Sequence, residues 1–168
     1  MQPIAARTLS DIDWENWKAQ DPATLTFVIK EDHILLIRKK RGLGAGKING
    51  PGGRLEEGET TLECAVREVQ EELKITPLNM AFHGECLFQF VDGYSIHVYA
   101  FAASDYDGIA EETDEAIPLW FHINDIPYDE MWEDDRCWLP LLLKKKNFIG
   151  RYLFDKDTML DYEIELLT

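Results

Sequence analysis

The sequence predicts an α/β (α+β) fold in which a mixed β-sheet packs against two main helices. Short runs of Val, Ile, Leu and Phe alternate with turn signals along most of the chain, as is typical of strands. One other stretch repeats apolar residues with the 3.6-residue period of a helix, and a second has an Asp cap at its start and lysines at its end. The chain has 168 residues, of which 45% are hydrophobic, so it can bury one core. We expect residues 1–21 to form an N-terminal extension and residues 22–168 to form a single domain.

The expected strands begin just after Pro22 and continue to the end of the chain. Glu31-Asp32 and Asp92-Gly93 are both turn candidates between two apolar runs, and Asp-Gly is one of the stronger short-range hairpin signals. These turns predict two hairpins within the sheet. The strands are predicted at residues 25–29, 34–37, 87–91, 96–101, 119–122, 150–154 and 159–166.

The first main helix is predicted to begin after Thr60, because Thr60 and Glu63 have the spacing of a capping box. Its buried stripe is Leu62, Ala65, Val66, Val69 and Leu73. A second helix is expected over residues 135–145, where Pro140 implies a kink or an irregular first turn. A short capped helix over residues 10–17 would pack its two tryptophans on the core.

The charge of the chain limits the partners that it can bind. A net charge of -15 argues against a nucleic-acid polymer, because binding many phosphates requires an excess of Lys and Arg. A small phosphorylated substrate that brings its own cation remains compatible. We therefore expect a small-molecule partner and no nucleic-acid polymer.

Cysteine usage and hydropathy bear on the compartment. Cys64, Cys86 and Cys137 are odd in number and lack any C-x-x-C spacing, so the sequence predicts neither a disulfide framework nor a zinc site. No stretch is long and apolar enough to span a bilayer, and residues 1–21 lack the regions of a signal peptide. We expect a cytoplasmic monomer with no membrane partner.

Three carboxylates on the first helix indicate a metal site. Glu68, Glu71 and Glu72 stand at i, i+3 and i+4, within an arc of roughly 100° beside the apolar stripe. Like charges at this spacing destabilise a helix, and a hard divalent cation such as Mg²⁺ or Mn²⁺ would offset their repulsion. The alternative is that these carboxylates only form a solvated acidic face of the helix. Without other residues in register, this alternative would be preferred.

The wider spacing favours the metal site. The chain resembles the Nudix (MutT-like) hydrolase family, whose sequence box reads G-x5-E-x7-R-E-U-x-E-E-x-G-U with U a bulky apolar residue. The matching residues are Gly53, Glu59, Arg67, Glu68, Val69, Glu71, Glu72 and Ile75. Lys74 replaces the last Gly of the box, which usually takes a left-handed conformation after the helix. The resemblance implies a Nudix α/β/α sandwich.

The same resemblance implies roles for the residues of the box. Glu68, Glu71 and Glu72, with the backbone carbonyl of Gly52, would hold the cations, which we expect to be Mg²⁺ with Mn²⁺ as a substitute. Arg67 and Glu59 would form a supporting ion pair that orients the helix. Glu115, within residues 111–115, is a candidate extra ligand or base, and a solvated acidic loop is its alternative.

Two longer stretches narrow the resemblance within the family. Residues 38–60 and 114–167 look like the animal oxidised-purine nucleoside triphosphatases, and this similarity runs from about Thr24 to the C-terminus. It implies Mg²⁺-dependent hydrolysis of 8-oxo-dGTP or 2-hydroxy-dATP to the monophosphate and pyrophosphate. A Nudix hydrolase for another nucleoside diphosphate-linked substrate is one alternative. A Nudix-fold binding module without catalysis is the other, although such modules commonly lose box carboxylates and this chain has lost none.

The closer resemblance also implies a purine pocket. Trp132 would stack on the base, while Asp134 and Asp135 would face its hydrogen-bonding edge opposite Asn49. The remaining candidates for the pocket are Thr24, Lys39, Phe88, Phe90, Ile96 and Trp138. Each of these residues also has an ordinary explanation. The two Asp residues could cap the second helix, Asn49 could form a turn, and the aromatic residues could belong to the core.

The glycine-rich stretch before the box is not a nucleotide P-loop. The pattern G-x-x-x-x-G-K-[ST] fails because Arg41 and Ile48 occupy two of its fixed positions. Its glycines could serve turns and close backbone approach, or cradle phosphate directly. Bulkier residues of the animal enzymes are replaced here, which predicts a wider or reshaped pocket wall. The replacements are Leu43, Ile48, Pro51 and Ala116.

Overall fold

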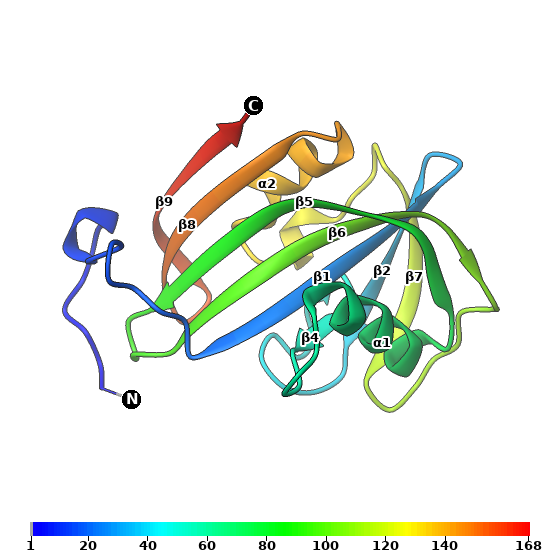
Figure 1. The fold of residues 1–168 in the computed structure, drawn as a ribbon, viewed down its shortest axis with the longest axis horizontal. Helices are drawn as coiled ribbons and strands as arrows, with labels where there is room; N and C mark the ends of the chain where they lie inside the picture. Colours follow the sequence, from blue (N-terminus) through cyan, green and yellow to red (C-terminus); the bar gives the residue numbers. More distant parts are fainter. Residues whose placement is uncertain (1) are drawn as a thin grey trace.

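The structure is a computed structural model that describes residues 2–168, and within them nine strands form one mixed sheet (Figure 1). The strand order is β3-β2-β1-β6-β5-β8-β9, with β4 paired to β1 and β7 paired to β2. The strands are β1 (Asp21–Lys30), β2 (His33–Lys39), β3 (Ile48–Asn49), β4 (Gly52–Arg54), β5 (Thr76–Phe90), β6 (Ser95–Asp107), β7 (Ala116–His122), β8 (Asn147–Asp155) and β9 (Thr158–Leu167). The helices are α1 (Thr61–Leu73) and α2 (Asp135–Leu143), with the 3-10 turns η1 (Leu9–Asp11) and η2 (Tyr128–Glu130).

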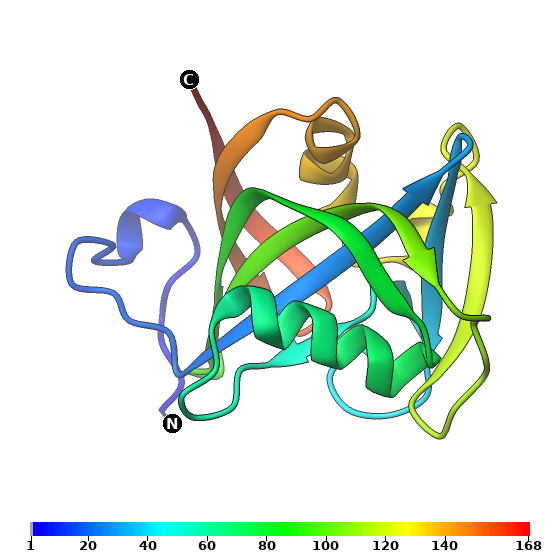
Figure 2. The same ribbon diagram turned by 45° about the vertical axis from the view of Figure 1, so that its right-hand side comes forward.

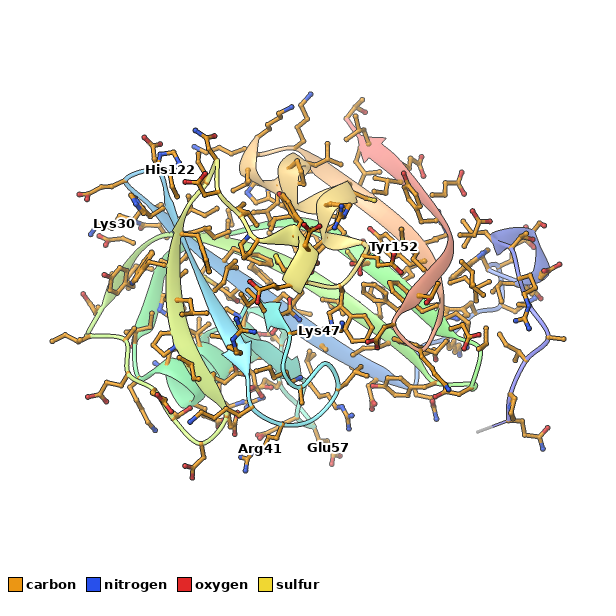
Figure 3. The ribbon with its side chains drawn as sticks, turned by 180° about the vertical axis from the view of Figure 1, so that it is seen from behind. Lys30, Arg41, Lys47, Glu57, His122 and Tyr152 are labelled. Atoms are coloured by element: carbon orange, nitrogen blue, oxygen red, sulfur yellow. The ribbon has the colours of Figure 1, made fainter. Side chains whose placement is uncertain are left out.

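The two helices cover opposite faces of the sheet. Figures 1 and 2 show α1 crossing the near face over β1, whereas α2 lies in front when the molecule is seen from behind in Figure 3. Alternate residues of β1 and β2 enter two separate apolar clusters, so both faces of these strands are buried. Phe27 and Leu36 pack with Trp138 of α2, while Val28 and Leu35 pack with α1. The expected α/β/α sandwich is therefore confirmed.

Helix α1 begins as the sequence predicts. The Thr60 hydroxyl accepts from Glu63 N at 3.1 Å, and Thr60 N donates to Glu63 Oε1 at 3.0 Å, which completes the capping box. Val69 and Leu73 are fully buried against β1 and β2. Leu62, expected in the same stripe, is instead 48% exposed in the first turn. The cap and the apolar stripe together fix which face of α1 is turned away from the sheet.

Helix α1 ends on a strained residue. Lys74 takes the left-handed conformation with φ 63°, and its N–H donates to Gln70 O at 3.0 Å. Replacing Lys74 by Gly should raise the free energy of unfolding by about 1 kcal/mol, since Gly adopts this conformation without a Cβ penalty. Urea unfolding measures the change. Lys144→Gly, at a cap residue with φ -88°, is the matched control and should give no gain. Equal effects of the two substitutions would contradict this explanation.

The strands β5 and β6 are much longer than the predicted ones. The sequence predicts only the ends of this hairpin, at residues 87–91 and 96–101, because the stretch before them is interrupted. Asn79 has a positive φ of 58°, and the pairing register shifts between Phe82 and Gly84. These irregularities break the alternating pattern without ending the strand. The short strands β3 and β4 were also missed, since they lie within the glycine-rich stretch.

The N-terminal extension forms one 3-10 turn rather than the helix expected at residues 10–17. The Asp11 carboxylate accepts from the backbone N–H groups of Arg7 and Thr8, which caps the start of the turn Leu9–Asp11, and the extended backbone of Ile12 ends it. Trp14 and Trp17 are half-buried, with ring centroids 5.3 Å apart. The extension still contacts the sheet, because Trp17 Nε1 donates to Gln89 Oε1 at 2.8 Å.

Two further features complete the fold. Cys64, Cys86 and Cys137 are free thiols, and the first two are buried. Within residues 2–168, no helix is long and apolar enough to cross a membrane. Neither feature indicates where an active site lies.

Candidate active site

Three carboxylates cluster between helix α1 and the loop that precedes β7. Glu68, Glu72 and Glu115 each place a carboxylate oxygen within 4.8 Å of the others. Helix α1 supplies the first two, one turn apart, and Glu115 comes from the loop just before β7. Oxygen-only ligands at this spacing suit Mg²⁺ or Mn²⁺.

Glu71 lies outside this cluster in the structure, and its predicted role as a cation ligand stays a prediction. At about 100° per residue, Glu72 lies roughly 40° from Glu68 around the helix, whereas Glu71 lies roughly 40° from Arg67. The Glu71 carboxylate is therefore drawn to Arg67 Nη1, at 3.2 Å, and its side chain is 51% exposed. Glu115 takes the third position instead.

Glu72 is the most buried of the three carboxylates. It is 5% exposed, and its Oε2 has no hydrogen-bond partner within the described residues. Burial, reinforced by the charges of Glu68 and Glu115, raises the pKa of Glu72 to about 8. Burial likewise raises the pKa of Glu68. A buried carboxylate with one unpartnered oxygen, close to two other carboxylates, fits a divalent cation, which would supply the missing positive charge.

Arg67 supports the cluster by joining Glu68 to Glu59 and to the end of β4. It donates to both carboxylate oxygens of Glu59, at 2.6 and 2.9 Å, and to Glu68 Oε1 at 2.8 Å. The Arg67 guanidinium lowers the pKa of Glu59 to about 2, so this pair stays ionised. Arg67 Nη2 also donates to Arg54 O at 3.1 Å, which attaches α1 to the end of β4. The predicted Arg67–Glu59 ion pair is present.

Two glycines of β4 allow the sheet to approach the cluster. A Cβ on Gly53 would lie 2.5 Å from Glu68 Oε2, and a Cβ on Gly52 would collide with the carbonyl oxygen of Thr24. Any larger residue would therefore displace Glu68 or break the pairing of β4 with β1. This close approach brings Gly52, the candidate carbonyl ligand, beside Glu72 at the floor of a pocket.

The pocket opens next to the cluster, on the face that α2 covers. Aromatic and aliphatic side chains of β1, β5 and β6 form its walls, and several polar groups converge in it. Phe88 stacks on Tyr152, with ring centroids 4.8 Å apart, so the wall is anchored in the core. The lining residues include Thr24, Lys39, Asn49, Phe88, Phe90, Ile96, Trp132, Asp134 and Asp135.

Asp134 and Asp135 are the buried carboxylates of this pocket, and neither caps α2. No side-chain cap hydrogen bond forms at Asp134, because its Oδ2 accepts from Trp138 Nε1 at 2.7 Å. Asp134 Oδ1 and Asp135 Oδ2 have no partner among the described residues. Burial raises the pKa of Asp134 to about 6, and burial together with the charge of Asp134 raises the pKa of Asp135. The pair can therefore hold a proton near neutral pH.

Trp132 lies at the mouth of the pocket, held by contacts from three directions. Phe90 and Phe154 make edge contacts with its ring, at centroid distances of 6.1 and 5.6 Å. Lys47 Nζ lies 5.2 Å from the ring centroid and pairs with Asp157 Oδ2 at 3.2 Å. Figure 3 labels Lys47 on the face seen there. These contacts hold the indole as a rigid platform for stacking.

The family model for the NUDIX domain matches residues 19–142, which is well over half of the chain. The chain belongs to the Nudix family. A Nudix protein from zebrafish, the oxidized purine nucleoside triphosphate hydrolase, is 40% identical over 144 residues, covering 84% of this chain and 92% of that protein. The mouse protein of the same name is 41% identical over 143 residues, with the same coverage.

A solved Nudix structure shares the fold. The MutT protein from Bacillus halodurans superposes with a TM-score of 0.79 at 24% identity, covering 86% of this chain and 97% of that one. At this level of identity the likeness concerns the fold alone. The family model and the two relatives confirm the Nudix resemblance drawn from the sequence box.

The structure gathers most of the predicted pocket residues, and it corrects two expectations. Trp138 is fully buried and stacks on Phe148, with centroids 5.6 Å apart, so it supports Asp134 from the core and does not line the pocket. Of the four replacements expected to reshape the pocket wall, only Leu43 lines it. Ile48, Pro51 and Ala116 are buried but do not line the pocket.

Other contacts of the site had no clear signal in the sequence. Arg41 Nη2 lies 3.1 Å from Glu115 Oε1, and the hydroxyl of Thr113 bonds to the main chain of both Glu72 and Glu115. Figure 3 labels Arg41 on the glycine-rich loop. Arg41 is 74 residues from Glu115 and Thr113 is 41 residues from Glu72, and neither belongs to a motif. Only the folded structure brings them together.

The raised pKa of Asp134 predicts a fall in stability as pH rises. Above pH 3.8 the unfolded chain releases this proton, while the native protein keeps it up to about pH 6. The free energy of unfolding should fall between these values, and Asp134→Asn should lessen the fall by on the order of 1–2 kcal/mol. Urea unfolding at pH 4 and pH 7 measures both. Asp129→Asn, at an exposed carboxylate on η2, is the matched control, and parallel profiles for all three proteins would contradict the assignment.

Proposed function

We propose that this Nudix hydrolase cleaves oxidised purine nucleoside triphosphates, such as 8-oxo-dGTP or 2-hydroxy-dATP, to the monophosphate and pyrophosphate. The single observation that carries the proposal is the juxtaposition of a carboxylate cluster with a pocket that has a buried pair of acids. Gly52, Gly53 and Glu72 all line that pocket, so its floor adjoins the cluster. The zebrafish and mouse relatives are named for this activity, and their alignments cover 84% of this chain. Such hydrolysis would remove damaged nucleotides from the precursor pool.

The hydrolysis would occur at the carboxylate cluster. Glu68 and Glu72, with Glu115 and the Gly52 carbonyl, would hold Mg²⁺, and Mn²⁺ could replace it. When bound, the cation would neutralise phosphate charge and lower the pKa of the attacking water. Water adds to a phosphorus beside the α–β bridging oxygen as that P–O bond breaks. This gives the monophosphate and pyrophosphate.

The surrounding residues position the groups that react. Arg67, anchored by Glu59, fixes Glu68 against the end of β4. Glu115 is either a further ligand or the group that accepts the proton of the water, and its 38% exposed side chain can reach solvent. Glu71 stands outside the cluster and would enter it only by leaving Arg67. Its role is therefore secondary to that of Glu72.

The base would be recognised by the acid pair and the indole. A purine stacked on Trp132 would present its edge to the free oxygens Asp134 Oδ1 and Asp135 Oδ2. Because the pair can share one proton, it offers both an acceptor and a donor, which suits either a guanine-type or an adenine-type edge. Asn49 would contact the opposite side of the base, and Lys39 lines the pocket near the cluster.

The remaining expectations are part of the same proposal. We infer a cytoplasmic monomer that acts on a small-molecule nucleotide and on no nucleic-acid polymer or membrane. The catalytic domain would comprise residues 22–168, with residues 1–21 as an extension that contacts the sheet through Trp17. A negative total charge fits a substrate that arrives as its cation complex.

A substrate panel with product analysis tests the reaction class. Oxidised purine triphosphates should release pyrophosphate in Mg²⁺, and release should stop when the cation is chelated. ADP-ribose, a nucleotide sugar and a dinucleotide represent the alternative Nudix substrates, and faster turnover of any of them would replace the proposal. Absence of turnover with every compound in Mg²⁺ or Mn²⁺ would favour a binding module.

A further inference from the structure

Glu115 must be held in place although it comes from an irregular loop. It lies 43 residues beyond Glu72 in the chain, on the segment between β6 and β7 that has no helix or strand. An irregular segment loses conformational entropy when a side chain is fixed in one position. Hydrogen bonds to a rigid element are the usual way to offset that cost.

The Thr113 hydroxyl makes the required connection. Thr113 Oγ1 donates to Glu72 O at 2.8 Å and accepts from Glu115 N at 3.2 Å. A hydroxyl has one donor and two acceptor positions, so one side chain can serve both groups. It joins the main chains of two residues whose carboxylates lie within 4.8 Å of each other.

The end of helix α1 gives this contact a firm base. Glu72 O is one of the last four carbonyls of the helix, which have no partner within it. Thr113 satisfies that carbonyl, and Glu111 N donates to the next one, Leu73 O, at 3.0 Å. The loop thus closes over the C-terminal end of the helix that carries Glu68 and Glu72.

The bonds that Lys40 and Arg41 make to Glu115 do not join it to helix α1. Lys40 N donates to Glu115 O at 3.0 Å, but it links the loop to the end of β2 and not to α1. Arg41 pairs with the Glu115 carboxylate itself, and its side chain is 66% exposed, so the pair is weak and screened. Only the Thr113 hydroxyl ties Glu115 directly to the main chain of Glu72 among these contacts.

We propose that Thr113 is a positioning residue that sets the separation of the Glu72 and Glu115 carboxylates and so strengthens divalent-cation binding. It acts through Glu115 and touches neither the substrate nor the cation. The inference rests on the proposed function, because it assumes that the carboxylate cluster binds a cation.

The test compares three substitutions by titrating Mn²⁺ alone, without nucleotide, and following free Mn²⁺ by electron paramagnetic resonance. Thr113→Val should weaken Mn²⁺ binding by about tenfold, as expected for the loss of hydrogen bonds near a buried group. Thr113→Ser keeps the hydroxyl and should stay within about twofold of wild type. Thr76→Val is the matched control, because Thr76 Oγ1 accepts from Gln70 Nε2 near the same end of α1 without contacting the cluster.

A double-mutant cycle separates positioning from a general loss of structure. In the Glu115→Gln background, Thr113→Val should weaken Mn²⁺ binding no further, because the ligand that Thr113 positions is already changed. With nucleotide, Thr113→Val should lower kcat while KM changes by less than about twofold. If thermal unfolding shows that the Thr113→Val protein is not folded, Thr113→Ala replaces it.

The proposal is overturned if Thr113→Val binds Mn²⁺ as wild type does. Equal loss in Thr113→Ser or in Thr76→Val would overturn it as well, since the hydroxyl or its location would then be irrelevant. The Mn²⁺ titrations need no substrate, so they stand or fall separately from the assignment of oxidised purines. A wrong substrate assignment would appear only in the nucleotide panel.

Discussion

Replacing Glu72 by Gln is expected to lower turnover by about a thousandfold or more, while nucleotide binding stays measurable. Glu72 is the most buried member of the carboxylate cluster and its Oε2 has no hydrogen-bond partner among the described residues, so under the proposed function its loss removes a cation ligand. A loss of several kcal/mol of transition-state stabilisation corresponds to this change in rate. Steady-state kinetics and an equilibrium binding measurement with a non-hydrolysable nucleotide separate the two effects.

Other glutamates on the same helix provide the controls. Glu71→Gln should cost at least about tenfold less than Glu72→Gln, because the Glu71 side chain is half exposed and bonded to Arg67. Glu63→Gln should be silent, since an amide oxygen can still accept from Thr60 N in the capping box. A Glu72→Gln enzyme with wild-type rates would remove this residue from the cation site. Without metal, the Glu72→Gln protein should be at least as stable as the wild type at pH 8, because it no longer buries a carboxylate.

The second large effect concerns the purine pocket. Asp134→Asn should change the ratio of kcat/KM between 8-oxo-dGTP and 2-hydroxy-dATP by about tenfold or more. The amide oxygen can keep the bond from Trp138 Nε1, but the group facing the pocket then becomes a donor. A guanine-type edge offers ring N–H and amino donors, so it should lose more. The loss should be about 1.5–3 kcal/mol, as is typical of a hydrogen bond to a charged group.

The expected change is one of preference rather than of chemistry. Turnover of the better substrate at saturation should remain within about threefold of wild type, because Asp134 stands apart from the carboxylate cluster. Asp129→Asn is again the control, and it should leave the ranking of nucleotides intact. An unchanged ranking in Asp134→Asn would count against base recognition by this pair.

The local parts of the site could be predicted from the sequence because they follow from helix geometry. The capping box determined where α1 begins, and the spacing of Glu68 and Glu72 placed both on one arc of the helix. The same spacing also placed Glu71 on this arc, but periodicity does not show which neighbour attracts a side chain. Arg67 stands four residues before Glu71 and binds it.

Contacts between distant segments were harder to predict. The sequence left Glu115 as either a ligand or base or part of a solvated acidic loop, and its place in the cluster involves the bond of Thr113 to Glu72 and the pairing of β7 with β2. Asp134 looked equally like a helix cap, and only the bond from Trp138 shows that its carboxylate does not cap α2. The β5–β6 hairpin was predicted around Asp92-Gly93, but the full length of β5 was not, because a bulge and a left-handed Asn79 interrupt its pattern.

The most direct test of the central claim is the ratio of kcat/KM for 8-oxo-dGTP to that for dGTP, measured in Mg²⁺ by pyrophosphate release. We expect kcat/KM for 8-oxo-dGTP to exceed that for dGTP by at least about tenfold, because the acid pair and Trp132 should recognise the altered edge of the oxidised base. A parallel preference for 2-hydroxy-dATP over dATP is expected from the same pocket. A ratio near one for both pairs would contradict the claim that this site selects oxidised purines.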